Sequence, residues 1–404
     1  MSEAGEEGFP SSFAVGYLFD ITIVYSTIVV CLNPLQLINK VPREPKRRIH
    51  VDVDEKIALV ARPPTEEIIT MQDIRNLFET NPHPNHYIGL EISGLLHLGS
   101  LIVTGFKIND FVEAGVRSRV FLADWHSYIN NKFNGDWDKI KIAAEYYKEA
   151  FRFFCPGVEV VHGSDLYAED KNYWENFIRF SKMITLARDT RCLTIMGRSE
   201  RDSLQFAQYL YPPMQAVDIK ALDVDIAHAG MDQRKVHMLV RETFPKLGWR
   251  TPIAVHHHLL PGLAEPVHLG LDEDSKTDEV ISSKMSKSKP WTCIFIHDSE
   301  EEIKAKLKKA WCPEGLVENN PVLEIAKHII FHQSNELNVD RPSKFGGPLV
   351  FNNYQELEAT YLGKKLHPAD LKLAVAESVN KIVQPVRDHF KGRADLLKIY
   401  EKEA

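Results

Sequence analysis

Short β-rich runs alternate with longer helical patterns from residue 86 onward, and this alternation constrains the fold more than any other feature. Strand-like runs cover 86–92, 119–124 and 158–163, and segments with helical spacing of apolar residues cover 97–114 and 136–154. Strands separated by helices in this way pair in parallel. The sequence therefore predicts an α/β fold with a doubly wound parallel sheet, whose ligands bind beyond the carboxyl ends of the strands.

The rest of the chain divides into further regions. A mostly helical stretch at about 165–210 interrupts the alternation and is predicted to be an insertion, after which a strand (223–230) and a helix (233–244) resume the pattern. Residues 271–280 are polar and acidic without apolar periodicity, which predicts a flexible linker. From 296 to 404 the pattern is helical, which predicts a separate, all-helical C-terminal domain.

The first 50 residues are an N-terminal extension of uncertain status. Residues 13–32 form an apolar run long enough to span a bilayer, but Asp20 lies near its middle and many of its residues are β-branched. A membrane anchor, a loosely packed extension and a start codon assigned too early all remain open. We expect no stable membrane association, because the long remainder of the chain has the composition of a cytosolic protein.

Charge and cysteine content limit the possible partners and the compartment. The chain has 404 residues, with 49 basic and 56 acidic side chains and a formal net charge of −7, so local patches must hold any nucleic acid. Its five cysteines are scattered and never form a C-x-x-C pair. This pattern argues against a disulfide framework and a structural zinc site and favours a cytoplasmic location with reduced thiols.

Two short motifs carry candidate phosphate chemistry. The segment Gly94-Leu-Leu-His97-Leu-Gly99 lies between the first strand and the first helix, where a glycine turn and a helix N-terminus can approach a phosphate and His97 can donate to an oxyanion. The loop Lys284-Met-Ser-Lys287-Ser288 carries two lysines suited to neutralise departing phosphate oxygens. Taken singly, the first is equally an ordinary glycine turn and the second a solvated loop.

Together, the motifs resemble the signatures of a known family. His97-Leu-Gly-Ser100 and Lys284-Met-Ser-Lys-Ser288 are similar to the HIGH and KMSKS motifs of class I aminoacyl-tRNA synthetases. The segments 211–218 and 230–239 look like the tyrosine-pocket segments of tyrosyl-tRNA synthetases of the archaeal and eukaryotic kind. The resemblance runs from about residue 50 to the C-terminus.

The resemblance implies activation of L-tyrosine by ATP to tyrosyl-adenylate and transfer of the tyrosyl group to tRNA(Tyr), with Mg²⁺ accompanying the ATP. It also implies a Rossmann-like catalytic domain at 51–270, a linker with the lysine loop at 271–295, and an anticodon-binding domain at 296–404. A homodimer joined through the 165–210 insertion is implied as well. Two rivals remain, a tryptophanyl-tRNA synthetase and a synthetase-like RNA-binding protein without catalysis.

The resemblance assigns roles to residues at matching positions. Tyr87 and Asp218 are expected to hydrogen-bond the substrate phenol, and a site that pairs a hydroxyl rejects phenylalanine by leaving buried polar groups unpaired. The α-amino group is expected to meet Tyr211, Gln215 and Gln233, with His126 as a further pocket residue. The expected ATP-binding residues are Gly94, His97, Gly99, Lys284, Met285, Ser286 and Lys287.

The expected catalytic residues are His97, Ser100, Lys284 and Lys287. Ser100 departs from the family pattern, which has a second histidine there, so we expect a slower or differently arranged enzyme. A serine hydroxyl can donate one hydrogen bond but carries no charge.

The tRNA contacts implied by the resemblance lie in two places. Arg234 and Lys235 match positions that contact the acceptor end, and four residues match positions that read the first anticodon base: Phe345, His367, Pro368 and Asp370. Stacking on an aromatic ring and edge recognition by a carboxylate suit a single-stranded base. The alternative interpretation is a core phenylalanine and a helix N-cap, since proline and aspartate favour a helix start.

The histidine run 256–258 does not predict a metal centre. Adjacent residues of a strand point to opposite faces, and no cysteine or carboxylate lies at ligand spacing in the sequence. We therefore predict no metal site in the protein.

Overall fold

The computed structural model describes residues 52–198, 203–270 and 274–400. The N-terminal extension, with its apolar run, lies outside these residues. Across the described ranges, no helix combines the length and apolar character needed to cross a membrane.

A six-stranded sheet forms the centre of the fold. Its strand order is β1-β6-β5-β2-β3-β4, and all pairings are parallel except that of β1 with β6. The strands are β1 (Thr65–Ile69), β2 (Asn85–Glu91), β3 (Arg117–Ala123), β4 (Glu159–His162), β5 (Ile226–Gly230) and β6 (Ile253–His257). The predicted doubly wound α/β fold is thus confirmed, and the antiparallel edge strand β1 is an addition that the alternation after residue 86 did not reveal.

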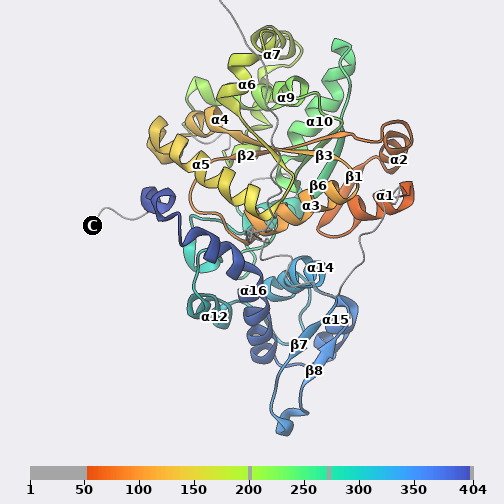
Figure 1. Cartoon of the computed structure of the whole chain (residues 1–404), viewed down its shortest axis with the longest axis vertical. Helices are drawn as coiled ribbons and strands as arrows, with labels where there is room; N and C mark the ends of the chain where they lie inside the picture. Colours follow the sequence, from red (N-terminus) through yellow and green to blue (C-terminus); the bar gives the residue numbers. More distant parts are fainter. Residues whose placement is uncertain (1–51, 199–202, 271–273, 401–404) are drawn as a thin grey trace, which may run out of the picture. The chain divides into compact units, whose positions relative to one another are not determined.

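The chain crosses the sheet in two directions from its middle. From β2 it proceeds to β3 and β4 on one side, and β5 and β6 lie on the other side. The boundary between β2 and β5 is therefore the topological switch point, where the carboxyl ends of parallel strands open a crevice. Figure 1 shows the strands between layers of helices.

The helices that precede or accompany the sheet are α1 (Val53–Ala61), α2 (Met71–Thr80), α3 (Thr104–Glu113), α4 (Asp124–Ile129), α5 (Trp137–Phe154), α6 (Gly163–Glu169), α7 (Tyr173–Ser181), α8 (Leu186–Thr190), α9 (Tyr211–Ala221), α10 (Arg234–Thr243) and α11 (Ser275–Ser283). Those that follow are α12 (Glu300–Lys309), α13 (Pro321–Ile325), α14 (Phe331–Gln333), α15 (Tyr354–Leu362) and α16 (Pro368–Phe390). Two π-helical segments, η2 (Leu98–Val103) and η9 (Ala326–Ile330), lead directly into α3 and α14. Short 3-10 turns are η3 (Lys132–Gly135), η4 (Leu193–Met196), η5 (Phe206–Leu210), η6 (Met231–Gln233), η7 (Phe244–Leu247), η8 (Pro290–Thr292), η10 (Ser343–Phe345) and η11 (Ala394–Tyr400).

The predicted helix boundaries follow from capping residues. Asp136 accepts the backbone N–H groups of Asp138 and Lys139 at the start of α5, as its position in the sequence predicted. Gly115, at φ 83°, follows the end of α3, where a left-handed residue stops the helix. The predicted helix 97–114 is present, but its first part is wound as the π-helical segment η2.

Each face of the sheet packs against its own hydrophobic core. Side chains alternate between faces along a strand, so Tyr87 and Ala227 join a core with α9, α10 and the insertion, whereas Ile226 and Val255 join a core with α1, α2 and α3. The segment 165–210, which we predict to be an insertion, carries α7 and α8. Both cores consist of residues with little or no exposure.

The predicted flexible linker at 271–280 is wrong for its described part. Residues 275–283 form helix α11, which begins at the capping residue Asp274. This helix is anchored by polar groups, because the buried Asp278 carboxylate accepts the backbone N–H of Gly270 and the hydroxyl of Ser282. Such an anchor leaves no apolar periodicity for a sequence pattern to reveal.

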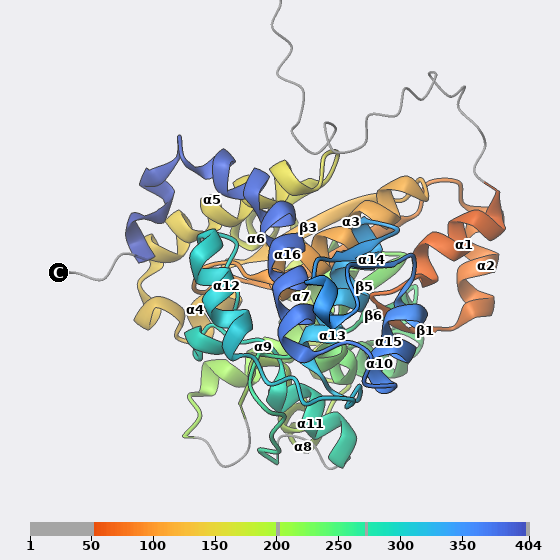
Figure 2. The same cartoon turned by 90° about the horizontal axis from the view of Figure 1, so that it is seen from below.

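The C-terminal region is mostly helical, as predicted, but it also contains a two-stranded antiparallel hairpin of β7 (Leu337–Val339) and β8 (Leu349–Phe351). The expectation of an all-helical domain missed this hairpin because its strands have only three residues each. Helices α12 and α16 lie side by side (Figure 2), and the hairpin lies at the end of this region away from the central sheet (Figure 1).

Candidate active site

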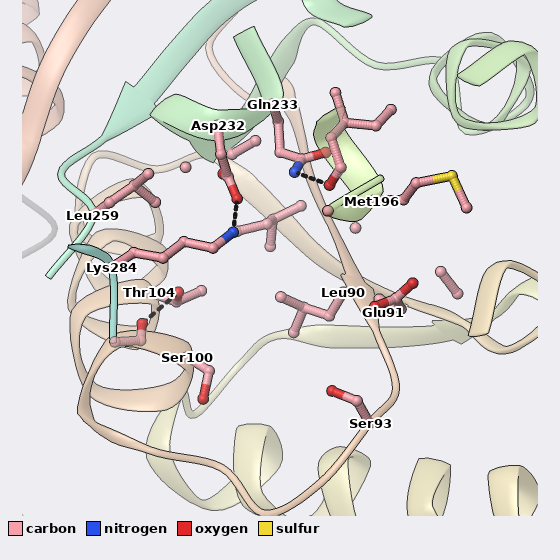
Figure 3. A pocket seen from close by; sticks show the side chains of 18 of the residues that line it. Leu90, Glu91, Ser93, Ser100, Thr104, Met196, Asp232, Gln233, Leu259 and Lys284 are labelled. Atoms are coloured by element: carbon pink, nitrogen blue, oxygen red, sulfur yellow. Dashed lines mark hydrogen bonds and ion pairs between the residues drawn. The ribbon is translucent and has the colours of Figure 1, made fainter. Parts of the chain in front are cut away.

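A cavity of about 610 Å³ opens beyond the carboxyl ends of β2, β3 and β5, at the switch point of the sheet. Every residue predicted to bind the amino acid or ATP lines this one cavity: Tyr87, Gly94, His97, Gly99, Ser100, His126, Tyr211, Gln215, Asp218, Gln233, Lys284, Met285, Ser286 and Lys287. Figure 3 shows Asp232, Gln233, Lys284 and Ser100 around it. Residues spread over 200 positions of sequence thus share one site.

The glycine turn after β2 places His97 at the start of η2. The backbone N–H of Gly99 donates to Nδ1 of His97 at 3.2 Å, and the backbone N–H of His97 donates to Oγ of Ser100 at 2.9 Å. Because Nδ1 accepts a hydrogen bond, the ring proton lies on Nε2. Burial lowers the pKa of His97 well below its usual value, and the charges of Lys287 and Lys284 act in the same direction. His97 is therefore a neutral donor.

Ser100 has a local role in this turn. Its hydroxyl accepts from the backbone of His97 and donates to the carbonyl of the same residue at 3.3 Å. The two residues cap the helix start reciprocally and satisfy backbone groups that would otherwise have no hydrogen-bond partner. Ser100 lines the cavity, but its hydrogen-bonding capacity is used to shape the turn.

Backbone pairing fixes the glycine turn to the segment that follows the lysine loop and fixes the start of the loop to the segment after β6. His97 pairs with Phe295 in an antiparallel bridge, with the N–H of Leu98 donating to the carbonyl of Ile294 at 3.1 Å. On the other side, Lys284 pairs with Pro261, and the N–H of Met285 donates to the carbonyl of Leu260 at 2.7 Å. The two motifs, far apart in sequence, thereby line the same cavity, and Nζ of Lys287 reaches Ser93 next to the glycine turn.

Each of the two lysines has a partner on the chain. Nζ of Lys284 lies 2.6 Å from Oδ2 of Asp232 (Figure 3). Burial opposes the charged form of Asp232, but the ammonium group of Lys284 outweighs it and lowers the carboxyl pKa. Nζ of Lys287 donates to Oγ of Ser93 at 2.8 Å and to the hydroxyl of Tyr147. Both cations therefore point into the cavity while held.

The opposite end of the cavity contains a buried carboxyl group, one oxygen of which has no partner among the described residues. Asp218 lies on α9 and has no solvent exposure; its Oδ1 accepts the hydroxyl of Tyr173 at 2.7 Å. Its Oδ2 makes no hydrogen bond with any residue that the structure describes, and Nε2 of His126 lies 3.6 Å away, equally without a partner. Such unpaired buried groups are rare and costly.

Burial determines the charge of both groups. It raises the pKa of Asp218 to about 8, although the hydroxyls of Tyr173 and Tyr167 act in the opposite direction. It lowers the pKa of His126 to about 3, so this ring is neutral at pH 7. The end of the cavity thus offers a carboxyl group and a neutral imidazole to a polar group from outside.

Tyr87 reaches the same end of the cavity from β2. Its ring lies along the strand over Gly89, where an added Cβ atom would come within 2.3 Å of the Tyr87 hydroxyl. Side chains two residues apart on a strand share a face, so only glycine leaves room for this orientation. Gly89 is a residue of the cavity wall that we did not predict, and the Tyr-x-Gly spacing in the strand is the signal that could have indicated it.

The predicted amino-group residues lie together on the cavity wall. Nε2 of Gln215 donates to Oε1 of Gln233 at 3.3 Å, and Nε2 of Gln233 donates to the carbonyl of Ile195 at 2.9 Å. The ring of Tyr211 packs edge-on against His126 at a centroid distance of 4.5 Å. The amide oxygens and the phenol of this group are suitable acceptors for an ammonium group.

Sequence reasoning missed the partners that hold these groups in place. They are Ser93, Tyr147, Tyr167, Tyr173 and Asp232. Tyr147, Tyr167 and Tyr173 resemble ordinary core aromatics in the sequence. Asp232, in contrast, is adjacent to Gln233, and its position at the end of a predicted strand was a usable signal.

The residues predicted to contact tRNA lie in two separate places. Arg234 and Lys235 begin α10 next to the cavity, and Nε of Arg234 lies 2.9 Å from a carboxylate oxygen of Glu67. In the C-terminal region, Phe345 is 60% exposed between β7 and β8, with Nζ of Lys344 over its ring.

The remaining predicted tRNA residues form the start of α16. His367 caps the helix by accepting the N–H of Ala369 at 3.1 Å, Pro368 is its first residue, and Asp370 lies in its first turn. Arg341 links this cap to the Phe345 turn, because its guanidinium donates to the carbonyls of Gly347 and Lys365. Sequence reasoning missed Arg341.

Two histidines of the 256–258 run point to opposite faces of β6, as expected. His256 lies 3.0 Å from His237, measured between ring nitrogens, and His257 lies 2.8 Å from His228. The other ring nitrogen of His256, Nδ1, lies 2.8 Å from a carboxylate oxygen of Glu67, so this ring bridges an imidazole and a carboxylate.

Comparison with known proteins agrees with this architecture. Residues 79–384 match the family described as tRNA synthetases class I (W and Y). This chain belongs to that family. The tyrosine–tRNA ligase of Thermococcus sibiricus is 45% identical over 368 residues, covering 86% of this chain and 98% of that protein. The ligase of Pyrococcus abyssi is 44% identical over the same coverage.

Solved structures of the same family share the fold. The crystal structure of tyrosyl-tRNA synthetase complexed with L-tyrosine from Pyrococcus horikoshii has a TM-score of 0.79 and 43% identity, and the match covers 86% of this chain and 99% of that one. The Plasmodium falciparum tryptophanyl-tRNA synthetase, at 16% identity and a TM-score of 0.60, is similar in fold. This class I synthetase chain therefore resembles the tyrosine enzymes in sequence as well as in structure.

Proposed function

We propose that this class I synthetase is a cytoplasmic tyrosine–tRNA ligase, which activates L-tyrosine with ATP and transfers the tyrosyl group to tRNA(Tyr). The observation that carries the proposal is the unpaired Oδ2 of Asp218, buried at one end of a cavity whose other end holds Lys284 and Lys287. The tyrosine named in the Pyrococcus horikoshii complex supports the same substrate.

The buried end of the cavity selects the amino acid. The phenol of tyrosine donates to Oδ2 of Asp218 and meets the hydroxyl of Tyr87, and the ammonium group meets Tyr211, Gln215 and Gln233. Phenylalanine leaves the carboxyl group and the hydroxyl unpaired in a dry pocket. Sites of this kind reject the analogue by about 10⁴- to 10⁵-fold without an editing step.

The other end of the cavity supports the activation step. ATP arrives as its magnesium complex, in which phosphate oxygens hold the ion. A tyrosine carboxylate oxygen attacks the α-phosphorus, the bond from that phosphorus to the bridging oxygen breaks, and pyrophosphate leaves. The Nε2–H of His97 donates to a phosphate oxygen, while Lys284 and Lys287 neutralise the pyrophosphate.

The lysines reach the phosphates by exchanging partners. Lys284 leaves Asp232 and Lys287 leaves Ser93, and both ammonium groups then bind phosphate oxygens of ATP, which carry more negative charge. The loop thus supplies positive charge from cations that are already in the cavity. Gly94 and Gly99 leave room for the nucleotide, with Met285 and Ser286 along the loop. Ser100 acts through the turn that orients His97, and its lack of charge implies a slower reaction than a second histidine supports.

The tRNA is held at two places on the protein. Arg234 and Lys235 lie beside the cavity, where the acceptor end arrives. Phe345 offers an exposed ring for stacking on an anticodon base. Arg341 joins the start of α16 to the Phe345 turn. There His367 and Asp370 offer polar atoms to the base edge, and Pro368 offers an apolar surface beside them.

The insertion forms a homodimer interface. Four large apolar side chains of this region, each between 42% and 68% exposed, are Trp174, Ile178, Met183 and Leu186. Exposed apolar patches of this kind mark interaction sites. Sedimentation of the wild-type protein and of Ile178→Asp should give a dimer and a monomer, respectively.

Amino-acid-dependent exchange of labelled pyrophosphate into ATP tests the proposed activity. We expect exchange with tyrosine and none with tryptophan or phenylalanine, followed by charging of tRNA(Tyr). Tryptophan-dependent exchange would identify the rival synthetase. Absence of exchange with every amino acid would identify a binding protein without catalysis.

A further inference from the structure

Two imidazoles and a carboxylate converge at the junction between the central sheet and the C-terminal region. His258 follows the end of β6, whereas Glu324 lies on α13 and His328 on η9, one helical turn further along. One ligand atom from each of these side chains lies within 4.8 Å of the other two. Residues four positions apart share a helix face, so Glu324 and His328 are presented to His258 together.

The contacts within this cluster are close but poorly aligned for hydrogen bonding. Nε2 of His258 lies 2.9 Å from Oε2 of Glu324, and Nε2 of His328 lies 3.2 Å from the same oxygen. Among the described residues, none of these three atoms has a hydrogen-bond partner. His328 is only 4% exposed, and neither of its ring nitrogens makes an aligned hydrogen bond with any residue that the structure describes. Buried ring nitrogens that lie close to one carboxylate oxygen without an aligned hydrogen bond have the arrangement expected of ligands of a shared metal ion.

A further carboxylate fixes the orientation of His258. Nδ1 of its ring bonds to Oε1 of Glu66 on β1, which leaves Nε2 to face Glu324 and His328. Metal-binding histidines almost always donate their second nitrogen to a carboxylate or carbonyl in this way. The backbone N–H of His258 also donates to the carbonyl of Pro64 at 2.8 Å, which holds the residue against the edge strand.

We propose that His258, Glu324 and His328 bind a divalent transition-metal ion, with Zn²⁺ the best match. Two imidazoles and one carboxylate are a ligand set of zinc, and the three protein ligands leave one position for water. The ion ties the loop after β6, which also lines the catalytic cavity, to the helices of the C-terminal region. Its role is to fix the position of that region relative to the active site.

The full chain, freed of metal by a chelator and titrated with Co²⁺ and with Zn²⁺, tests this inference. We expect one equivalent of Co²⁺ to give the visible absorption of a low-symmetry, four-coordinate site without thiolate bands, and Zn²⁺ to displace it and raise the melting temperature. A wild-type protein with no such spectrum and no thermal shift would overturn the proposal. The cluster would then be an ion pair of Glu324 with two imidazoles, whose rings stack at a centroid distance of 4.1 Å.

Three variants locate the ion. His328→Gln and Glu324→Gln should abolish the Co²⁺ spectrum, and Glu66→Gln should weaken the affinity by about 10- to 100-fold. His332→Gln is the matched control, because His332 lies one turn beyond His328 but contacts Asp110 and Pro63 instead. It should bind the ion as the wild type does. Unchanged binding in both His328→Gln and Glu324→Gln would contradict the assignment, and circular dichroism checks that each variant is folded.

Discussion

The two ends of the catalytic cavity satisfy their polar groups in opposite ways. At the end that we assign to the phosphates, both lysines are held by residues of the chain, Lys284 by Asp232 and Lys287 by Ser93 and Tyr147. At the end that we assign to the amino acid, Oδ2 of Asp218 and Nε2 of His126 are buried and find no hydrogen-bond partner within the described part of the chain. At the phosphate end, side chains of the protein occupy the groups that would bind the ligand. At the amino-acid end, no described side chain does so.

The difference reflects what each end must do. Mobile cations can exchange one anionic partner for another as charge develops, so their resting contacts cost little. A buried carboxyl group without a partner penalises every ligand that cannot supply a hydroxyl, which converts the cost of burial into selectivity. The amino-acid end, which we call the rigid end, thus provides specificity. The phosphate end, which we call the exchangeable end, stabilises developing charge.

The largest expected effect breaks the rigid end. Asp218→Ala should reduce kcat/KM for tyrosine in pyrophosphate exchange by about 10⁴-fold or more, because the phenol loses its buried partner. Asp223→Asn is the matched control, since Asp223 is an exposed aspartate of the following turn at φ 50°, which asparagine tolerates. Activity of the Asp218 variant near the wild-type level would show that the phenol binds elsewhere.

Removal of a single lysine breaks the exchangeable end. Lys284→Gln and Lys287→Gln should each lower kcat for activation by about 10²- to 10³-fold, as expected for the loss of one group that stabilises developing charge. The KM for tyrosine should stay the same, because neither lysine contacts the amino acid. Lys289→Gln, an exposed lysine of the same loop, is the control. A rise in the tyrosine KM would contradict the separation of the two ends.

A smaller change displaces the phenol of Tyr87. The methyl group of Gly89→Ala would lie 2.3 Å from the Tyr87 hydroxyl and force it to move. A displacement of about 1 Å in an active site costs about 10²-fold in rate, and we expect this loss in kcat/KM for tyrosine with the ATP KM preserved. Gly392→Ala, whose added atom meets nothing within 4 Å, should behave as the wild type. Equal activity of both variants would exclude Tyr87 from the pocket.

The smallest expected effect is a change in thermal stability. Because burial raises the pKa of Asp218 from 3.8 to about 8, the unfolded state releases this proton first, and the folded state loses stability as pH rises from about 4 to about 8. Asp218→Asn lacks this penalty, so its melting temperature should exceed that of the wild type by a margin that grows over this range. Parallel curves for the two proteins would show that the carboxyl group is not desolvated.

The pattern of strands and helices predicted the sheet and the location of the site well. The alternation of strand and helix patterns predicted β2, β3, β4 and β5. The general rule for parallel sheets predicted that the ligand-binding crevice lies beyond the carboxyl ends of the strands. The edge strand β1 lies before the alternation begins, and α11 is anchored by Asp278 and not by apolar residues. Periodicity records apolar burial only, so elements held by polar contacts escape it.

The residues of the site were predictable where a motif fixes them and not where the tertiary fold supplies them. His97 and Lys284 belong to motifs, whereas Tyr173, which holds Asp218, comes from another helix and has no local signature. The histidine run shows the same limit. No carboxylate lies near His258 in sequence, yet Glu324 approaches it from a helix more than sixty residues later. Distance in sequence hides such neighbours.

Binding of tyrosine and phenylalanine to the wild type and to Asp218→Asn, measured by calorimetry, tests the central claim most directly. We predict that the wild type prefers tyrosine by at least about 10³-fold and that the variant binds the two amino acids within about tenfold of each other, because the preference originates in one buried oxygen. A preference that is the same in both proteins would contradict the account.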